Sequence, residues 1–463
     1  MSRMLLKCGT VVTMDPAILD MDQGDVVFEG DKIVAVGRDI DVKDGDEVID
    51  ASGMIVMPGL VNTHIHTWQT GIRGVGGNFA GTNYVDAVHS GLATHYEPDD
   101  IYIGNLIGAI NQIDSGVTTI VDWCHNNPTP DHTDNAIAAL DEVGIRALFL
   151  HGSAKPPAKP GEQPYFLVPL NKSHVRRLRE GRFSSSDGLL TLGIAVLGPQ
   201  IGVTDVAIED FRFAKDFDLI VSLHHSNGKM RGPDGYVQAA REGLLSNMVN
   251  IVHGNQLTDA DFNLLVDNGA TFTVTAEGEM KSAYGELLTG RLRARGVDVP
   301  IGSDTEVFYS PDMFTCMRVT MQAERHRVSL KSLAENGEKP KVTPVKTYEA
   351  LRWATMDGAR MAHLDRQIGS LTPGKQADIV MLRKRDLNLV SCYDPINAIV
   401  LHANPGNVDT VFIAGRKKKA NGKVNFNNLD AKLAGLEASS RRIISDFLAT
   451  SPTVGSVFRN QAP

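Results

Sequence analysis

The feature that most constrains the fold of this chain is a series of apolar, strand-like runs that each end in a histidine or an aspartate. The first run, residues 57–66, closes with His64 and His66. Alternate side chains of a strand point to the same face, so these two imidazoles can reach one ion. Histidines at this spacing also occur in ordinary packing, and they indicate a metal site only where further ligands follow in the chain.

Three further apolar, β-branched runs end in a side chain that can bind a metal. Each run is long enough for one buried strand, and the distances between them fit whole numbers of strand–helix units of roughly 25 to 40 residues. We expect all of these polar residues at the C-terminal ends of strands. The runs are residues 219–225, 249–253 and 299–304, which end in His224 and His225, in His253 and in Asp304.

The remaining strands of a repeated unit are found in the gaps between these runs. Helical segments lie between the strands: residues 99–115 end before Gly116, and Thr258 with Asp261 forms a capping box for a helix that runs to about residue 268. Eight alternating units predict an α/β fold, a closed (β/α)8 TIM barrel with its active site at the C-terminal rim. The added strands are residues 118–123, 146–151, 190–197 and 270–275.

Composition excludes several other classes of protein. The chain has 463 residues, of which 42% are hydrophobic and 22% charged, enough for a large core. A net charge of -9 argues against nucleic-acid binding, and the basic run 416–419 is interpreted as a solvated hairpin. No apolar run approaches the roughly 18 residues of a membrane span. Four scattered cysteines without a CxxC pair indicate a reducing compartment, so we expect a cytoplasmic protein with no membrane or nucleic-acid partner.

Short strands and turns occur on both sides of the predicted barrel. Residues 1–57 and 366–426 are expected to pair into one small β-sandwich, because neither segment alone could bury a hydrophobic face. The barrel then spans residues 58–365. Residues 427–463 are predicted to form a C-terminal helix and tail, which packs on its own domain or, alternatively, contacts another subunit. Residues 155–164 are expected to form a surface loop after the third strand.

Several of these motifs, in this order, resemble those of the amidohydrolase superfamily. The resemblance covers about residues 1–425 and is greatest to the cytosine deaminase and triazine hydrolase branch. Members of that branch hold one metal ion on a (β/α)8 barrel with a flanking β-sandwich. The motifs that carry the resemblance are residues 58–66, 116–119 and 371–378 together with His224, His253, Ser303 and Asp304.

The resemblance implies a complete metal site. His64, His66, His224 and Asp304 match the ligands of one divalent ion, for which zinc is expected and iron or manganese would also fit. His253 matches a histidine that contacts the metal-bound water, and Asp304 is expected to accept the proton of that water. Two-metal relatives carry a modified lysine at the end of the fourth strand, whereas residues 195–200 contain none.

Only one of the two adjacent histidines at the end of the fifth strand can follow the inward direction of that strand. We prefer His224 because it directly ends the apolar run 219–223, and His225 would then point to the neighbouring layer. His225 remains the alternative.

The chain departs from the family pattern at two positions on the rim. Asn227 stands where deaminases of this branch usually carry a proton-donating glutamate, and an amide cannot transfer a proton. Gln200 stands where many relatives have a histidine. Glu277 or Glu279 could replace the missing acid, and Glu279 is preferred as a catalytic residue, although a solvated loop is the alternative for both.

A small, planar, nitrogen-containing substrate suits this site, since aromatic rim residues can stack on a flat ring. We predict hydrolysis of a carbon–nitrogen bond, first as deamination of a nitrogen heterocycle and alternatively as amide or urea cleavage. A metal-free scaffold is the non-enzymatic alternative, and a homo-oligomer is expected. The residues predicted to bind the substrate are Trp68, Gln69, His125, Gln200 and Asn227.

Overall fold

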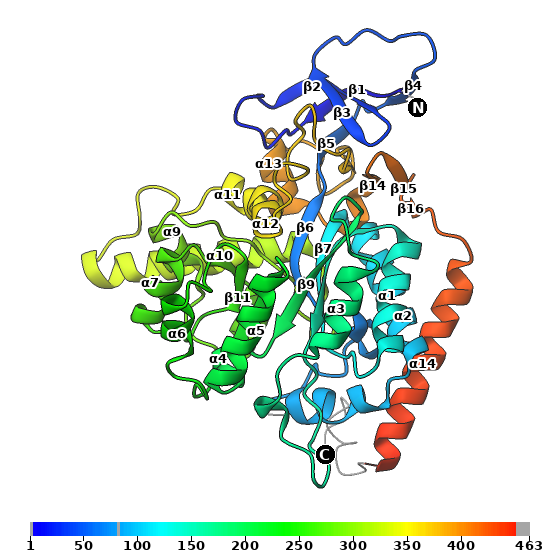
Figure 1. The fold of residues 1–463 in the computed structure, drawn as a ribbon. Coiled ribbons are helices and arrows are strands. Elements are labelled where there is room, and N and C mark those ends of the chain that lie inside the picture. The colour runs from blue at the N-terminus through cyan, green and yellow to red at the C-terminus, as the bar shows by residue number, and fades with distance from the viewer. Residues whose placement is uncertain (1–2, 81–83, 451–463) are drawn as a thin grey trace, which may run out of the picture.

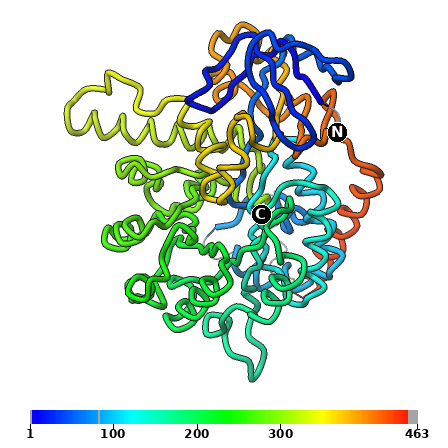
Figure 2. The backbone as a smooth tube through the Cα atoms, turned by 45° about the horizontal axis from the view of Figure 1, so that its top comes forward, coloured from blue at the N-terminus to red at the C-terminus, as the bar shows by residue number. Residues whose placement is uncertain are grey.

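The computed structural model describes residues 3–80 and 84–450 and contains two β-sheet systems (Figure 1). One is a parallel barrel surrounded by helices, and the other is a mixed sheet built from both ends of the chain. In Figure 2 the N-terminal and C-terminal segments of that second sheet lie side by side above the barrel.

Seven strands of the barrel pair in chain order, each parallel to the next. Nearly every residue in them is buried, as expected for parallel strands whose outer face is covered by helices. The runs that end in histidine therefore all finish at the same end of the barrel. The strands are β6 (Leu60–Ile65), β7 (Val117–Cys124), β8 (Arg146–Gly152), β9 (Leu190–Val196), β10 (Ile220–His225), β11 (Val249–His253) and β12 (Thr271–Thr273).

The eighth position of the barrel is filled by residues 299–304 through two isolated parallel bridges. Ile301 pairs with Val274, and Asp304 pairs with Ile65, so the segment connects β12 to β6 and closes the ring. Gly302 is required here, because an added Cβ would lie only 2.7 Å from the backbone nitrogen of His64. The predicted TIM barrel is confirmed, with its last strand reduced to these bridges.

Helices cover the barrel, and the predicted capping signals act where expected. The helix α7 begins after Thr258, whose hydroxyl oxygen accepts a hydrogen bond from the Asp261 N–H at 3.0 Å. The helices are α1 (Pro98–Asp114), α2 (Pro130–Val143), α3 (Lys172–Glu180), α4 (Gly198–Ile201), α5 (Thr204–Asp216), α6 (Gly235–Arg241), α7 (Asp259–Asp267), α8 (Ala276–Lys281), α9 (Thr289–Ala294), α10 (Met313–Asn336), α11 (Thr347–Arg352), α12 (Gly358–Met361), α13 (Pro395–Asn397) and α14 (Leu429–Thr450).

The flanking β domain joins both ends of the chain, as predicted, and its strands form one hydrogen-bonded sheet. The order is β16-β15-β14-β13-β5-β1-β2-β3, with β4 beside β1. The central antiparallel pair of β5 and β13 links the N-terminal part to the C-terminal part. The strands are β1 (Arg3–Val11), β2 (Met21–Glu29), β3 (Lys32–Gly37), β4 (Glu47–Asp50), β5 (Met54–Pro58), β13 (Ile379–Arg383), β14 (Val408–Ile413), β15 (Arg416–Ala420) and β16 (Lys423–Val424).

The basic run 416–419 is not simply solvated, which corrects the expectation from sequence. The Lys418 ammonium donates to the Val143 carbonyl oxygen at 2.8 Å, and Lys419, only 3% exposed, donates to the Asp114 carbonyl oxygen at 2.7 Å. These carbonyls end α2 and α1, where a cation also interacts favourably with the helix dipole. The two lysines therefore attach the β domain to the barrel at the end where the barrel strands begin.

The C-terminal helix α14 runs along the outside of α1 in the same chain (Figure 1). Its apolar side chains Leu436, Ile443 and Phe447 are buried, and Ser439 donates to a carboxylate oxygen of Asp100 at 2.6 Å. The residues predicted as a tail beyond 450 lie outside the described part of the chain. Of the helices described here, none has both the length and the apolar character needed to cross a membrane.

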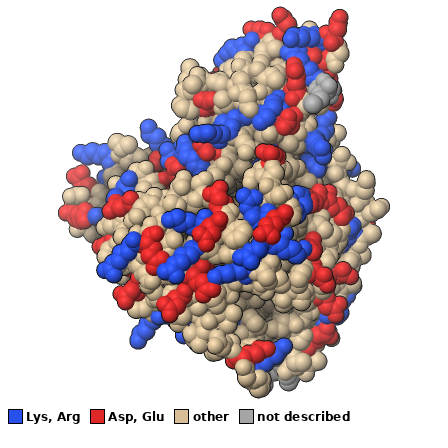
Figure 3. All heavy atoms as spheres, viewed as in Figure 1, with Lys and Arg blue, Asp and Glu red and all other residues tan. Residues whose placement is uncertain are grey.

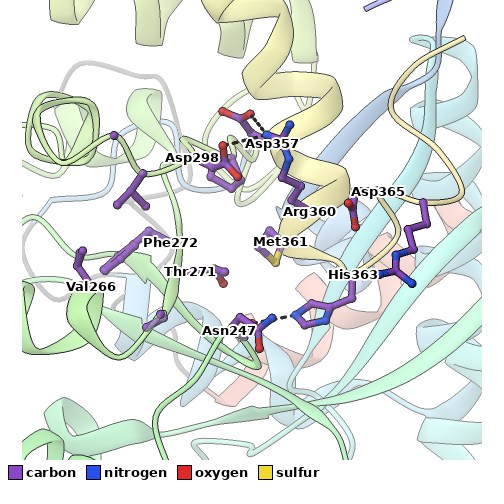
Figure 4. Close-up of a pocket in the computed structure, with 16 residues that line it drawn as sticks. Asn247, Val266, Thr271, Phe272, Asp298, Asp357, Arg360, Met361, His363 and Asp365 are labelled. Carbon is purple, nitrogen blue, oxygen red and sulfur yellow. Dashed lines mark hydrogen bonds and ion pairs between the residues drawn. The ribbon is translucent and has the colours of Figure 1, made fainter. Parts of the chain in front are cut away.

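A cavity of about 730 Å³ lies at the strand-beginning end of the barrel, next to α12 (Figure 4). Arg360 crosses it to pair with Asp298 at 3.0 Å and with Asp357 at 3.1 Å. Asp357 also accepts the Val299 N–H at 3.0 Å, which fixes the start of the eighth segment. Arg360, Asp298 and Asp357 are therefore paired with one another at this cavity.

Candidate metal centre and cavity

Four side chains predicted to bind a metal come together at the C-terminal end of the barrel strands. His64 and His66 lie on β6, His224 lies on β10, and Asp304 ends the eighth segment; one ligand atom from each falls within 4.8 Å of the others. Asp304 Oδ1 is 3.3 Å from His64 Nε2 and 3.4 Å from His66 Nε2. The Nε2 atoms of His64 and His224 are 3.2 Å apart.

These distances fit a single metal ion. Ligand atoms about 2.1 Å from a tetrahedral ion are about 3.4 Å from one another. Burial, followed by the charge of His64, lowers the pKa of His66 to about 3, so its ring is neutral and offers a lone pair. Burial alone would raise the pKa of Asp304, but its hydrogen bond with His64 and the nearby imidazoles lower it overall. Neutral imidazoles and one ionised carboxylate are the donors that zinc prefers.

Neighbouring groups orient the members of this cluster. His66 Nδ1 donates to the Trp123 carbonyl oxygen at 2.8 Å, which leaves Nε2 available for a metal. The Tyr309 hydroxyl donates to Asp304 Oδ2 at 3.2 Å, on the oxygen that does not face the histidines. The two oxygens of Asp304 thus have different surroundings.

The adjacent histidines of β10 point in different directions. His224 lies in the cluster, whereas His225 Nδ1 is 3.0 Å from the Tyr236 hydroxyl on α6. Since successive side chains of a strand alternate, only His224 faces the barrel interior.

His253 lies beside the cluster on strained backbone. Its ring centroid is 5.4 Å from that of His224, and its φ of 69° is left-handed, as is the φ of 66° at Asp304. A non-glycine residue in this region costs roughly 1–3 kcal/mol, and such strain clusters at functional sites. Both residues turn the chain sharply at the rim of the barrel.

Glu279 lies behind His253. Its carboxylate accepts the Thr275 N–H at 2.7 Å and the Asn255 side-chain amide at 3.1 Å, and it is 3.4 Å from His253 Nδ1. The side chain is fully buried and is not part of the cavity lining. Glu279 therefore reaches the site through His253, while Glu277 is half-buried on the same helix and makes no contact with the cluster.

A cavity of about 760 Å³ opens above the cluster, and three of the five predicted substrate-binding residues line it: His125, Gln200 and Asn227. Asn227 is exposed, so it lies at the mouth of the cavity. Other lining residues were not predicted: the aromatic residues Phe79, Tyr84, Tyr165, Tyr284, Phe308 and Tyr309, with His89 and Lys155.

Trp68 and Gln69 do not reach this cavity, which corrects the prediction that they contact the substrate. Trp68 is fully buried, packs edge-on against Tyr96 and donates its indole N–H to His125 Nδ1 at 3.3 Å. Gln69 is also fully buried and donates to the Tyr84 hydroxyl at 2.8 Å. The chain turns into a short helical segment, Thr67–Ile72, directly after β6, and this turn directs both side chains into the packing beneath the site.

Lys155 belongs to the loop that the sequence suggested was merely on the surface. It follows β8 by three residues, is half-buried, and places its ammonium 5.9 Å from the centroid of the Trp123 ring. Burial lowers the pKa of Lys155 to about 8, although Asp304 acts in the opposite direction. Its position just after a rim strand could have indicated that Lys155 lines the cavity. Tyr84 and His89 could not be found in this way, because they belong to a π-helical turn that follows no recognisable sequence pattern.

Known proteins resemble this chain along most of its length. A 5'-deoxyadenosine deaminase from Methanothermobacter thermautotrophicus is 26% identical over 88% of this chain and 92% of its own. A 5-methylthioadenosine/S-adenosylhomocysteine deaminase from Moorella thermoacetica is 27% identical over 93% and 97%.

Solved structures share the fold. An adenosine deaminase from Xanthomonas campestris with bound zinc has a TM-score of 0.81 at 23% identity, covering 96% of this chain and 99% of its own. An atrazine chlorohydrolase from Arthrobacter aurescens TC1 with zinc has a TM-score of 0.81 at 18% identity, covering 94% and 100%. The model of the amidohydrolase family matches residues 55–418. The chain belongs to the amidohydrolase family.

Proposed function

We propose that this protein is a zinc-dependent deaminase that hydrolyses the exocyclic amine of a nitrogen heterocycle. The family match and the deaminase names of the relatives confirm the prediction of a hydrolase that acts on non-peptide carbon–nitrogen bonds. The observation that carries the proposal is the cluster of His64, His66, His224 and Asp304 at the base of an aromatic cavity. An adenine nucleoside is the first substrate to test, since the relatives bear such names.

In this proposal the three imidazoles and Asp304 hold the ion. When bound, a divalent ion supplies a water whose pKa is lowered to about 7, which is the nucleophile of the reaction. Asp304 accepts a proton from the attacking water and delivers it to the departing amine, so water and the amine yield a carbonyl or hydroxyl product and ammonia. The hydrogen bond from Tyr309 holds this carboxylate in place.

His253 is proposed to stabilise the negative charge that develops as the heterocycle is attacked. Its Nδ1 faces Thr275 and Glu279, so Nε2 is left for the reacting group. The buried carboxylate of Glu279 lies 3.4 Å from Nδ1 and orients the ring. Glu279 is thus a positioning residue in this mechanism.

The position of Asn227 supports a second candidate function. An exposed amide at the mouth of the cavity cannot protonate a ring nitrogen. Amide or urea cleavage needs no protonated ring nitrogen: a metal ion, when bound, would polarise the carbonyl, and Asp304 would pass the proton of the water to the leaving amine. Both candidates use the same cluster and differ in substrate.

The decisive experiment is a screen of the zinc-loaded protein for released ammonia or amine. Adenosine, 5'-deoxyadenosine and methylthioadenosine represent deamination, and simple aryl amides and ureas represent the second candidate. We expect ammonia release from at least one aminated heterocycle and a loss of turnover in His64→Ala. Turnover that persists in His64→Ala, or a purified protein with substoichiometric metal and no activity, would contradict the proposal and favour a scaffold.

A further inference from the structure

The cavity is strongly cationic although the chain is acidic. Four cationic side chains line it, whereas Asp304 is the only carboxylate among the described residues that line it, on a chain of net charge -9. Throughout residues 3–80 and 84–450, no carboxylate pairs with any of these four cations. They are Lys155, Lys229, Arg231 and Lys281.

The outer surface is different, since opposite charges lie side by side there (Figure 3). Three arginines on or just after the helices α3 and α5 meet carboxylates at 2.7 to 2.8 Å. These surface pairs contrast with the four cations of the cavity, none of which has a carboxylate partner among the described residues. The surface pairs are Arg177 with Asp134, Arg182 with Asp141, and Arg212 with Glu242.

Lys155 is the cation most enclosed by the cavity. The other three are exposed at the mouth, where Lys281 donates to the Phe79 carbonyl oxygen at 3.0 Å and Arg231 lies 3.9 Å over the Phe166 ring. Lys155 has no hydrogen bond or ion pair with any described residue. A half-buried ammonium without a partner is costly, and an anion in the cavity would compensate it.

His125 presents a second unpaired polar atom to the same cavity. Its Nδ1 is 3.3 Å from the Trp68 indole nitrogen, which can only donate, and also 3.3 Å from the Trp123 carbonyl oxygen, which can only accept. Its Nε2 is buried and has no partner among the described residues.

Gln200 presents a second donor. Its Oε1 accepts the Ser226 N–H at 2.8 Å, which fixes the amide and leaves Nε2 as a buried donor without a partner in the described chain. Gln200 is only 5% exposed and lines the cavity. A buried unsatisfied donor costs about 1–3 kcal/mol, so this amide in a cavity with an unpaired lysine indicates a missing acceptor.

We propose that the substrate carries an acidic group, a carboxylate or a phosphate, which Lys155 binds together with Gln200. The inference rests on the proposed function, because it assigns the substrate class of that site: an anionic, aminated heterocycle. The aromatic walls hold the ring, and the donors of Lys155 and Gln200 hold the oxygens of the acidic group.

The test measures binding to the zinc-loaded full-length protein by calorimetry and does not depend on turnover. Benzoate and benzamide differ mainly in charge, and phenyl phosphate represents the phosphate group. We expect wild type to bind benzoate or phenyl phosphate at least tenfold more tightly than benzamide; whichever anion binds more tightly identifies the acidic group. Lys155→Met should remove most of this preference and Lys155→Arg should retain it.

Lys159→Met is the matched control, because Lys159 is exposed on the same loop and does not line the cavity. The Lys159→Met variant should retain the preference for the anion. If Lys155→Met does not fold, Lys155→Gln takes its place. Equal binding of benzoate, phenyl phosphate and benzamide to wild type, or an anion preference that survives in Lys155→Met, overturns the inference. If the protein releases ammonia from neutral amines and shows no preference for anions, the inference fails and the proposed function stands. If it prefers anions but releases no ammonia from any substrate, the proposed function fails and only the anion-binding site stands.

Discussion

Asp304 meets His64 twice: its N–H donates to the His64 carbonyl oxygen at 2.9 Å, and its Oδ1 lies 3.3 Å from His64 Nε2. The first contact closes the barrel between its first and last segments. The second brings two proposed ligands together. Closure of the fold and assembly of the cluster therefore depend on the same pair of residues.

This pair allows the ligand role of Asp304 to be separated from its structural role. Asp304→Asn keeps the backbone contact with His64 but removes the charged ligand, so the variant should fold and lose zinc affinity by at least about 100-fold. Metal content by mass spectrometry and thermal unfolding by circular dichroism measure the two effects. Asp259→Asn, which changes the same charge at an exposed position, should bind zinc as wild type does. Full zinc occupancy in Asp304→Asn would refute the role.

Removal of the metal should stop catalysis reversibly. A chelator is expected to abolish ammonia release, and stoichiometric zinc should restore it. Because a ligand that binds only the folded state stabilises it, zinc at 100 times its Kd should add about 2.7 kcal/mol to the free energy of unfolding. Turnover that withstands complete removal of the metal would rule out the mechanism.

Glu279 can be tested against a second glutamate on α8. Glu279→Gln removes the charge beside His253 but keeps a hydrogen-bonding side chain, and kcat should fall about 10- to 100-fold with KM little changed. Glu277→Gln should stay within about twofold of wild type, since Glu277 makes no contact with His253. Equal kcat in the two variants would mean that Glu279 has only a packing role.

Asp210 should make stability depend on pH. Burial raises the pKa of this carboxyl to about 7 in the folded protein, whereas the unfolded value is about 3.9. Between these values the folded state holds a proton that the unfolded state has released, so this group makes the wild type less stable as pH rises from about 4 to 7.

Asp210→Asn removes this titration and keeps an acceptor for the Leu170 N–H. Relative to wild type, the variant should gain up to about 1.4 kcal/mol of stability per pH unit across the window and change little above it. Urea unfolding at pH 5, 6 and 7 measures the slope. Asp216→Asn on the same helix is exposed and should show no such gain; a pH-independent difference for Asp210→Asn would contradict the prediction.

The lysines of β15 provide a test of how the two domains are held together. Lys419→Met breaks a buried, charged hydrogen bond to the end of α1 and should lower the free energy of unfolding by about 1.5–3 kcal/mol. Lys417→Met should cost at most about 1 kcal/mol, because its contact with Glu47 is exposed. Chemical unfolding of both variants gives the comparison, and equal losses would show that Lys419 does not anchor the domains.

The barrel and its cluster could be predicted because each ligand ends a run of buried, β-branched residues. His64, His224 and Asp304 are distant in sequence, yet the fold places the C-terminal ends of all parallel strands on one rim. The choice of His224 over His225 followed from the alternation of side chains along a strand.

The lining of the cavity could not be predicted in the same way. Trp68 and Gln69 follow the strand β6, and the helical turn after that strand buries both side chains. No periodic pattern in the sequence predicts this turn. Lys155 was predicted to lie on the surface because its loop is rich in proline and lysine. Its contact with the Trp123 ring depends on tertiary packing, which the local sequence does not show. Likewise, the sequence around Lys418 and Lys419 predicts a solvent-exposed hairpin, because the helix ends that these lysines contact lie about 300 residues earlier in the chain.

Lys418 and Lys419 hold the β domain at the end of the barrel where the strands begin, while the cavity opens at the end where they finish. The contact between the two domains and the opening of the cavity therefore lie at opposite ends of the barrel. Loops around the opening, including the one that bears Lys155, can be shortened, grafted or randomised without disturbing the anchor. The barrel is therefore suited to directed evolution of new specificities, because mutations in these loops leave the contacts of Lys418 and Lys419 between the two domains unchanged.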